Sequence, residues 1–299
     1  MKKYGVRGAA WAAGLVWCGL LPAQPTAIEL LERKSLEQIQ EFDRGFDGVL
    51  GVAAIDLTTG HLFGYHIDSV FPQASVIKIP ILIAIYQAQQ EGRFRLSDSI
   101  TLDPKDSVGG SGHLQEALKK GPLKLTLREM VNAMIEDSDN TATNKWIAIL
   151  GMEYVNGATA ALGAKQTRLG RRMMDSAAAI RNDENLSTPA DMARLVELIY
   201  RGRAVDRAAS DEMIAFMKKV HGGIAEGLPL DVPTASKIGE IPGARGETGI
   251  VYLEGRPFVL SVMGTFLDDR RSPVPEVTRI VFRYFEKLAA SNRFGNRLR

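Results

Sequence analysis

Strand-like segments lie at both ends of this chain, and the stretch between them has mostly helical patterns. Residues 48–66 hold two short apolar runs around a turn at 58–60, which is typical of a β-hairpin. Three further strand-like segments occur near the C-terminus, at residues 234–239, 248–253 and 257–265. The economical architecture is therefore one antiparallel sheet built from both ends of the chain, flanked by helices, with a helical subdomain inserted.

The helical patterns also carry start and stop signals. Thr126 is followed three residues later by Glu129, which predicts a capping box at the start of a helix over residues 126–137. Further helices are predicted over residues 28–43, 140–150, 188–200 and 274–290. We therefore expect an α/β fold of the α+β kind. In it, residues 28–299 form one catalytic domain, with 28–72 and 222–299 in the sheet part and 73–221 in the helical part. A binding cleft is expected between the two parts.

Residues 1–23 have the layout of a secretory signal peptide. A basic start is followed by an apolar run over residues 9–21 that is too short to span a bilayer comfortably, and cleavage is predicted near Ala23. An uncleaved membrane anchor is the alternative. Attachment of a lipid to Cys18 is disfavoured, because the bulky Trp17 stands where a small residue would be expected. We predict a periplasmic or secreted protein.

Charge balance and histidine spacing argue against several function classes. The 37 basic and 35 acidic residues give no electrostatic reason to expect nucleic acid as a partner. Loss of the leader would remove three positive charges, leaving a net charge of −1, and would remove Cys18, the single cysteine. The four histidines form no H-E-x-x-H pair, which argues against a zinc hydrolase. No cofactor is expected. The expected protein is a monomer that acts on a small molecule, with no stable membrane partner.

The first motif with catalytic potential is the pair Ser75 and Lys78. Their spacing of three residues places both side chains on one face of a helix, within reach of each other. A serine hydroxyl needs a base to become a good nucleophile, and a lysine serves when apolar surroundings lower its pKa. Pro80 predicts an irregular helix just past Lys78. By itself, S-x-x-K is a common chance pattern.

The second motif is Ser138-Asp139-Asn140, in a short polar turn between two predicted helices. Such a turn can project side chains into a cleft, where Ser138 could relay a proton to a leaving nitrogen. Asn140 could hydrogen-bond a substrate amide and Lys78. The structural alternative is that Asp139 or Asn140 simply caps the following helix, and both roles are compatible.

The third motif is residues 236–239, S-K-I-G, on a predicted strand. Lys237 can hold a substrate carboxylate and set the electrostatic field around Ser138. Gly239 allows a substrate backbone to lie against the strand as an added edge. A surface lysine on an edge strand is the alternative interpretation of this motif.

In this order and on these elements, the three motifs resemble those of the class A β-lactamases and related penicillin-recognising serine enzymes. The resemblance covers nearly all of the chain after the leader, and includes G-G-S-G-H-L-Q at 109–115 and T-P-A-D-M-A at 188–193. It implies an enzyme that opens β-lactams through an acyl-serine, with Ser75 as nucleophile, Lys78 as its base and no metal. It also implies an oxyanion hole made by the backbone amides of Ser75 and Glu240. His113, in a loop similar to the cleft rim of that family, is either a substrate contact or an exposed loop residue.

Two departures from the family pattern have chemical consequences. Ile238 stands where a Thr or Ser usually binds the substrate carboxylate. In the loop over residues 168–188, the position of the glutamate that activates the deacylating water falls on Met173 or Arg172, depending on the end from which it is counted. Asp175 is the nearest carboxylate in sequence, and Glu184 lies further along.

These departures give two alternatives for the reaction. The first is β-lactam hydrolysis with slow or atypical deacylation, in which Asp175 is the candidate base. The second is a D-Ala-D-Ala peptidase or esterase, an acyl-transfer enzyme on a peptidoglycan-like amide or an ester that β-lactams acylate. General-base help in deacylation is worth about 10²- to 10⁴-fold, so its absence would leave a long-lived acyl-enzyme.

Overall fold

The computed structural model describes residues 1, 25–268 and 271–298, so all but the first residue of the predicted signal peptide lies outside the described residues, as does Cys18. Within that part of the chain, no helix is both long and apolar enough to cross a membrane.

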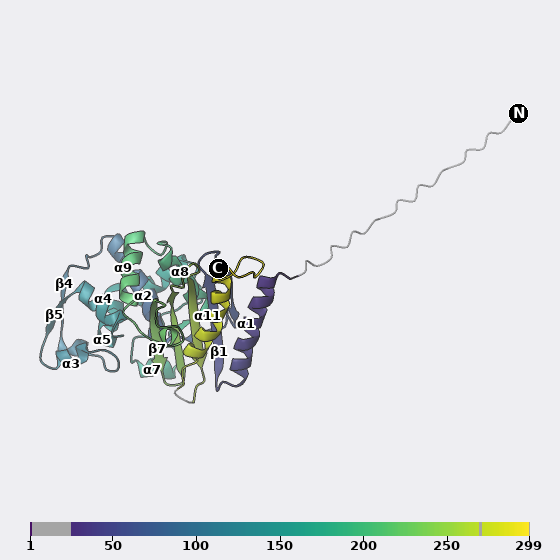
Figure 1. The fold of residues 1–299 in the computed structure, drawn as a ribbon. Coiled ribbons are helices and arrows are strands. Elements are labelled where there is room, and N and C mark those ends of the chain that lie inside the picture. Colours follow the sequence, from purple (N-terminus) through teal and green to yellow (C-terminus); the bar gives the residue numbers. More distant parts are fainter. Residues whose placement is uncertain (2–24, 269–270, 299) are drawn as a thin grey trace.

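A five-stranded antiparallel sheet joins the two ends of the chain, as the sequence predicts (Figure 1). Its strand order is β2-β1-β9-β8-β7, with bounds β1 Val49–Asp56, β2 Leu62–Tyr65, β7 Thr234–Ile241, β8 Ala244–Val251 and β9 Phe258–Thr265. The N-terminal hairpin meets the C-terminal strands where β1 pairs with β9 along its whole length. This pairing leaves β7 as an edge strand, beside the helical part.

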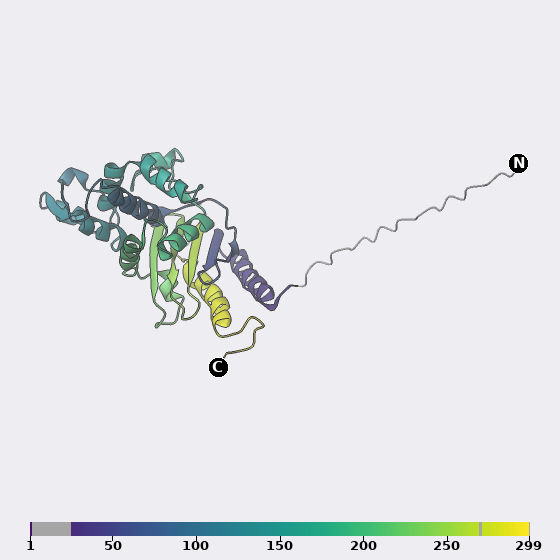
Figure 2. The ribbon, with the colours of Figure 1, turned by 90° about the horizontal axis from the view of Figure 1, so that it is seen from above.

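The two terminal helices, α1 (Ala27–Arg44) and α11 (Val274–Ala289), lie together against one face of the sheet (Figures 1 and 2). Thr26 and Glu29 form a capping box that starts α1. The layer between these helices and the sheet is apolar. Within it, the rings of Phe258 and Phe285 stack with centroids 4.1 Å apart.

The helical part lies on the other side, around a central helix, α2 (Lys78–Gln90), whose residues are nearly all buried. A helix that is apolar on every side belongs in the interior, and here the other helices surround it. The remaining helices are α3 Leu114–Leu118, α4 Leu127–Ile135, α5 Asn140–Leu150, α6 Met152–Ala161, α7 Ser176–Ile180, α8 Pro189–Tyr200, α9 Arg207–Met217 and α10 Gly223–Glu226, with short 3₁₀ helices η1 Ala74–Ile77 and η2 Pro104–Asp106.

Two local features differ from the sequence predictions. Two small ladders interrupt the helical part, one between β3 (Phe71–Pro72) and β6 (Leu186–Ser187), the other between β4 (Ser99–Leu102) and β5 (Leu123–Thr126). The helix irregularity lies before Lys78 rather than after it, because α2 begins at Lys78. Pro80 therefore falls in the first turn, where a backbone N–H would have no partner within the helix and its absence costs little.

Candidate active site

A cavity of 540 Å³ opens between the edge strand β7 and the helical part. Its walls come from η1, the segment 110–111, the loop 168–188 and the end of β7. The residues that line it are Ala74, Ser75, Gly110, Ser111, Asn140, Arg171, Met173, Met174, Ser176, Ala179, Glu184, Asn185, Glu240, Ile241 and Pro242. Of the residues predicted from the sequence, it brings together Ser75, Asn140 and Glu240.

Ser75 and Lys78 face each other at the start of α2. The Nζ atom of Lys78 lies 2.9 Å from Ser75 Oγ, which is the nucleophile–base contact that the spacing predicts. Lys78 is completely buried. Burial lowers the pKa of Lys78 well below its ordinary value, and the nearby charge of Lys237 lowers it further, whereas Asp139 opposes the shift. The neutral amine that can accept the Ser75 proton is therefore favoured.

The turn before α5 brings Ser138 to the same lysine. Ser138 has a positive φ of 54°, a strained conformation for a residue with a side chain, and both its oxygens lie near Lys78. Lys78 Nζ is 2.6 Å from the Ser138 carbonyl oxygen, 3.0 Å from its Oγ and 3.2 Å from Asn140 Oδ1. Asn140 also donates from Nδ2 to the Gly109 carbonyl at 3.0 Å, which fixes the orientation of its amide.

Asp139 holds this turn in place. Its Oδ1 accepts from the Ala142 amide at 2.8 Å and caps α5, while its Oδ2 accepts from the Leu114 amide at 2.9 Å and ties the turn to α3. Asp139 is therefore the residue of this motif that caps α5, and Asn140 lines the cavity.

Lys237 reaches the same turn from β7. Its Nζ lies 3.1 Å from Ser138 Oγ and donates to the Ile238 carbonyl at 3.1 Å. Burial lowers the pKa of Lys237 to about 8, and Glu247 opposes this shift. Ser138 Oγ therefore lies between two lysine amines, and a chain of close polar contacts runs from Ser75 through Lys78 and Ser138 to Lys237.

Gly239 allows β7 to approach the nucleophile. A Cβ atom at this position would lie 2.6 Å from the Gln73 carbonyl oxygen, so a side chain would push the strand away from η1. The close approach puts Glu240 on the cavity wall together with Ser75. The oxyanion hole formed by their amides stays a prediction. The Glu240 carboxylate forms an ion pair with Arg245 at 2.8 Å.

The loop 168–188 presents methionines to the cavity. Asn144 of α5 clamps the Met173 backbone, with Oδ1 accepting from the Met173 amide at 2.8 Å and Nδ2 donating to its carbonyl at 3.1 Å. Met173 and Met174 both line the cavity. Asp175 instead caps α7, accepting from the Ala178 amide at 2.9 Å, and is not among the lining residues.

Glu184 is the loop carboxylate on the cavity wall, and it is bound to Arg171 by two hydrogen bonds of 2.8 and 3.1 Å. Asn185 accepts from the Gly170 and Arg171 amides at 2.9 and 3.0 Å, closing the base of the loop. No sequence motif predicts a role for Asn144 or Asn185. A side-chain amide that binds a distant backbone leaves no local sequence pattern.

His113 lies outside the lining of this cavity. Its Nδ1 is 3.3 Å from Asp137 Oδ2, and its side chain is largely exposed. The geometry therefore gives His113 a carboxylate partner on the surface.

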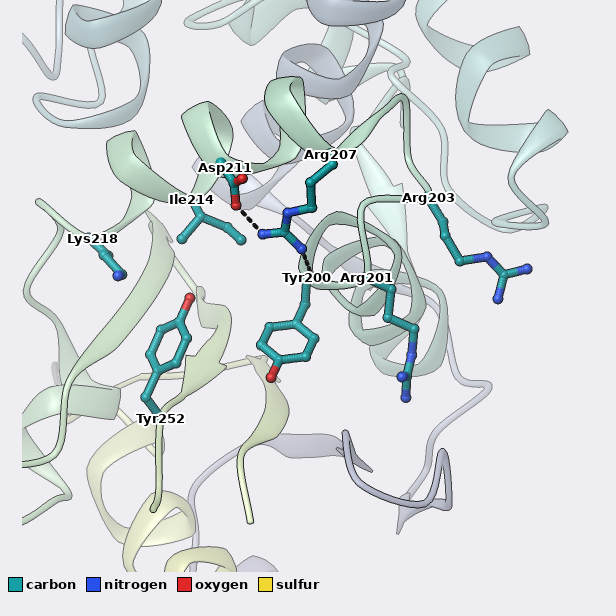
Figure 3. Close-up of a pocket in the computed structure, with 8 residues that line it drawn as sticks. All are labelled: Tyr200, Arg201, Arg203, Arg207, Asp211, Ile214, Lys218 and Tyr252. Carbon is teal, nitrogen blue, oxygen red and sulfur yellow. Dashed lines mark hydrogen bonds and ion pairs between the residues drawn. The ribbon is translucent and has the colours of Figure 1, made fainter. Parts of the chain in front are cut away.

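A second cavity, of 680 Å³, lies between the end of α8, α9 and the end of β8 (Figure 3). Its lining is basic and aromatic: Tyr200, Arg201, Arg203, Arg207, Asp211, Ile214, Lys218 and Tyr252. None of the residues from the three motifs is among them, so the cavity beside Ser75 is the candidate active site.

Comparisons with known proteins agree with this geometry. The model of the beta-lactamase enzyme family matches residues 34–285. An imipenem-hydrolyzing beta-lactamase of Enterobacter cloacae is 26% identical over 242 residues, which cover 78% of this chain and 82% of that protein. A beta-lactamase structure from Sphaerobacter thermophilus superposes with a TM-score of 0.78 at 28% identity, covering 85% of this chain and 97% of that one. The structure of PBP-A gives the same TM-score at 29% identity, covering 85% and 96%. With its serine–lysine–serine–lysine site between the five-stranded sheet and the helical part, the chain belongs to the class A β-lactamase family of serine hydrolases.

Proposed function

We propose that this protein opens β-lactam amides through an acyl intermediate on Ser75 and releases the product slowly. The observation that carries the proposal is the position of Lys78 Nζ, 2.9 Å from Ser75 Oγ and 3.0 Å from Ser138 Oγ. One amine can thus take a proton from the nucleophile and return it through Ser138.

In this geometry each proton transfer of the acylation reaction has both a donor and an acceptor. Neutral Lys78 accepts the Ser75 proton as Oγ attacks the lactam carbonyl, and the amides of Ser75 and Glu240 stabilise the oxyanion. As the carbon–nitrogen bond breaks, Ser138 gives its proton to the nitrogen and regains one from Lys78. Lys237, beside Ser138, binds the substrate carboxylate.

The cavity wall supports slow deacylation. Met173, whose backbone Asn144 holds beside the cavity, has no group that can accept a proton from water. Among the described lining residues the carboxylates are Glu184 and Glu240, and each is ion-paired with an arginine. Oxygens of both carboxylates are thus already engaged as acceptors in these ion pairs. Asp175, the candidate base from the sequence, caps α7 with its carboxylate and is not among the residues that line the cavity.

The alternative is an acyl-transfer enzyme on a peptidoglycan-like amide, such as a D-Ala-D-Ala peptidase. The position of Met173 and Met174 on the cavity wall favours this alternative as well. A protein that does not hydrolyse its β-lactam adduct behaves as a penicillin-binding protein. A structurally similar chain is a single-residue mutant of PBP-A in an acyl-enzyme complex with penicillin G, 28% identical with a TM-score of 0.78.

The test combines turnover with mass analysis. Purified protein is mixed with a chromogenic cephalosporin, and intact mass is followed over time. We expect a Ser75 adduct that forms readily and disappears slowly, and no adduct in Ser75→Ala. Absence of an adduct in the native protein would refute the proposal. An adduct that never turns over, with release of D-alanine from a D-Ala-D-Ala peptide, would establish the alternative.

We further propose that residues 1–23 direct export to the periplasm or beyond, and that the mature enzyme is a monomer. Expression with and without these residues, followed by cell fractionation and light scattering, tests both points. Full activity in the cytoplasmic fraction of cells that express the complete chain would refute export.

A further inference from the structure

Glu247 is a buried carboxylate behind the edge strand of the active site. It lies on β8, where it pairs in register with Ile238 of β7, and its residue is 1% exposed. Its Oε1 accepts from the Ser236 hydroxyl at 2.6 Å, and its Oε2 accepts from the Ile224 amide at 3.0 Å. A buried carboxylate needs such donors, and this one draws them from two different elements.

This carboxylate lies on the opposite face of β7 from the active-site amine. Side chains alternate along a strand, so Ser236 and Ile238 point away from the side to which Lys237 points. Ser236 hydrogen-bonds Glu247, whereas Lys237 contacts Ser138 on the cavity side. Two buried groups of opposite charge are therefore separated by the backbone of one strand.

The segment before α10 closes over the carboxylate. A Cβ at Gly222 would lie 2.6 Å from both Glu247 Oε2 and Ile238, so glycine is required for this close packing. Ile238 supplies an apolar neighbour across the strand pair. The residue that departs from the family pattern at position 238 is thus part of the enclosure of Glu247.

We propose that Glu247 is a positioning residue for Lys237, holding residues 222–224 against the back of β7 and stabilising the charged form of the Lys237 amine from behind the strand. This role rests on the proposed function, in which charged Lys237 binds the substrate carboxylate beside Ser138.

The other charges around Lys237 make such a group necessary. On the cavity side stand the amine of Lys78, which supplies no negative charge, and Asp139, whose carboxylate is engaged by the Ala142 and Leu114 amides. Burial lowers the pKa of Lys237 to about 8, and Glu247 is the charge that counteracts this. Burial also raises the pKa of Glu247, against its hydrogen bonds and Lys237. A carboxylate at this place therefore keeps Lys237 charged near neutral pH.

The test is the pH dependence of Ser75 acylation by a carboxylate-bearing β-lactam in Glu247→Gln. We expect the alkaline limb of the rate profile to move to lower pH, because the variant removes the negative charge that opposes the lowering of the Lys237 pKa by burial. Glu226→Gln is the matched control, since Glu226 is an exposed carboxylate on the adjacent α10 and should leave the limb in place. An unchanged limb in Glu247→Gln would overturn the proposal, as would a uniform loss of rate at every pH.

A second variant and a second readout cover the remaining outcomes. Ser236→Ala removes one hydrogen bond from the Glu247 carboxylate and should move the alkaline limb of the acylation profile in the same direction by a smaller amount. This variant provides the test if Glu247→Gln does not fold. NMR titration of the Lys237 amine in the same proteins needs no substrate. If the native protein is never acylated, the proposed function fails, whereas an unchanged Lys237 titration in the variants refutes the role of Glu247.

Discussion

Met173→Glu should shorten the lifetime of the acyl-enzyme that we propose forms on Ser75. Asn144 fixes the Met173 backbone with hydrogen bonds of 2.8 and 3.1 Å, and the residue lies on the cavity wall beside the nucleophile. Glutamate has about the length of methionine, so the substitution introduces a base without a large change in volume. General-base catalysis is worth about 10²- to 10⁴-fold, and we expect the acyl-enzyme lifetime to shorten by at least about 10²-fold.

The assay is the decay of the Ser75 adduct. The protein is acylated briefly with a penicillin, excess reagent is removed, and the adduct mass is followed by quenched-flow mass spectrometry. Met173→Gln is the matched control, because glutamine has the shape of glutamate but cannot take a proton from water. Asn144→Ala combined with Met173→Glu should lose most of the gain, since the clamp is then absent.

Equal lifetimes in Met173→Glu and Met173→Gln would refute the reasoning. This result would mean that the side chain at position 173 does not contact the water that attacks the acyl bond. Acylation rates should change little in both variants, because Ser75, Lys78 and Ser138 keep their contacts.

Three further predictions concern other parts of the site. Lys78→Met should slow acylation by about 10²- to 10⁴-fold, because it removes the base. In the native protein the acylation rate should rise as the pH passes through the lowered pKa of Lys78, since the neutral amine is the base. An acylation rate that falls over this pH range would contradict the assignment of Lys78. Asp139→Ala should lower the free energy of unfolding by about 2 kcal/mol, because it removes the α5 cap and leaves the buried Leu114 amide unpaired, and denaturant unfolding measures this. Asp175→Asn should leave both acylation and deacylation unchanged, because asparagine preserves the α7 cap outside the cavity lining; slower decay of the adduct would instead identify Asp175 as the base.

The local parts of the fold could be predicted from the sequence because their causes lie within a few residues. The capping box at Thr126 depends on a partner three positions away, and so does the contact between Ser75 and Lys78. The sequence does not predict the short ladders around β4 and β6, because strands of two to four residues show too little alternation of apolar and polar side chains.

The sequence by itself determined the order of the motifs and the elements that carry them, and through them the family and the candidate nucleophile and base. Tertiary structure alone decided which distant groups meet. Lys237 reaches Ser138 across 99 positions of chain, Asn144 clamps Met173, and Asp175 turns to its own helix while Glu184 pairs with Arg171. The burial of Glu247 depends on how β8, Gly222 and Ile238 close around one carboxylate. Such contacts depend on packing between elements far apart in the chain, whereas spacing along the chain constrains only near neighbours.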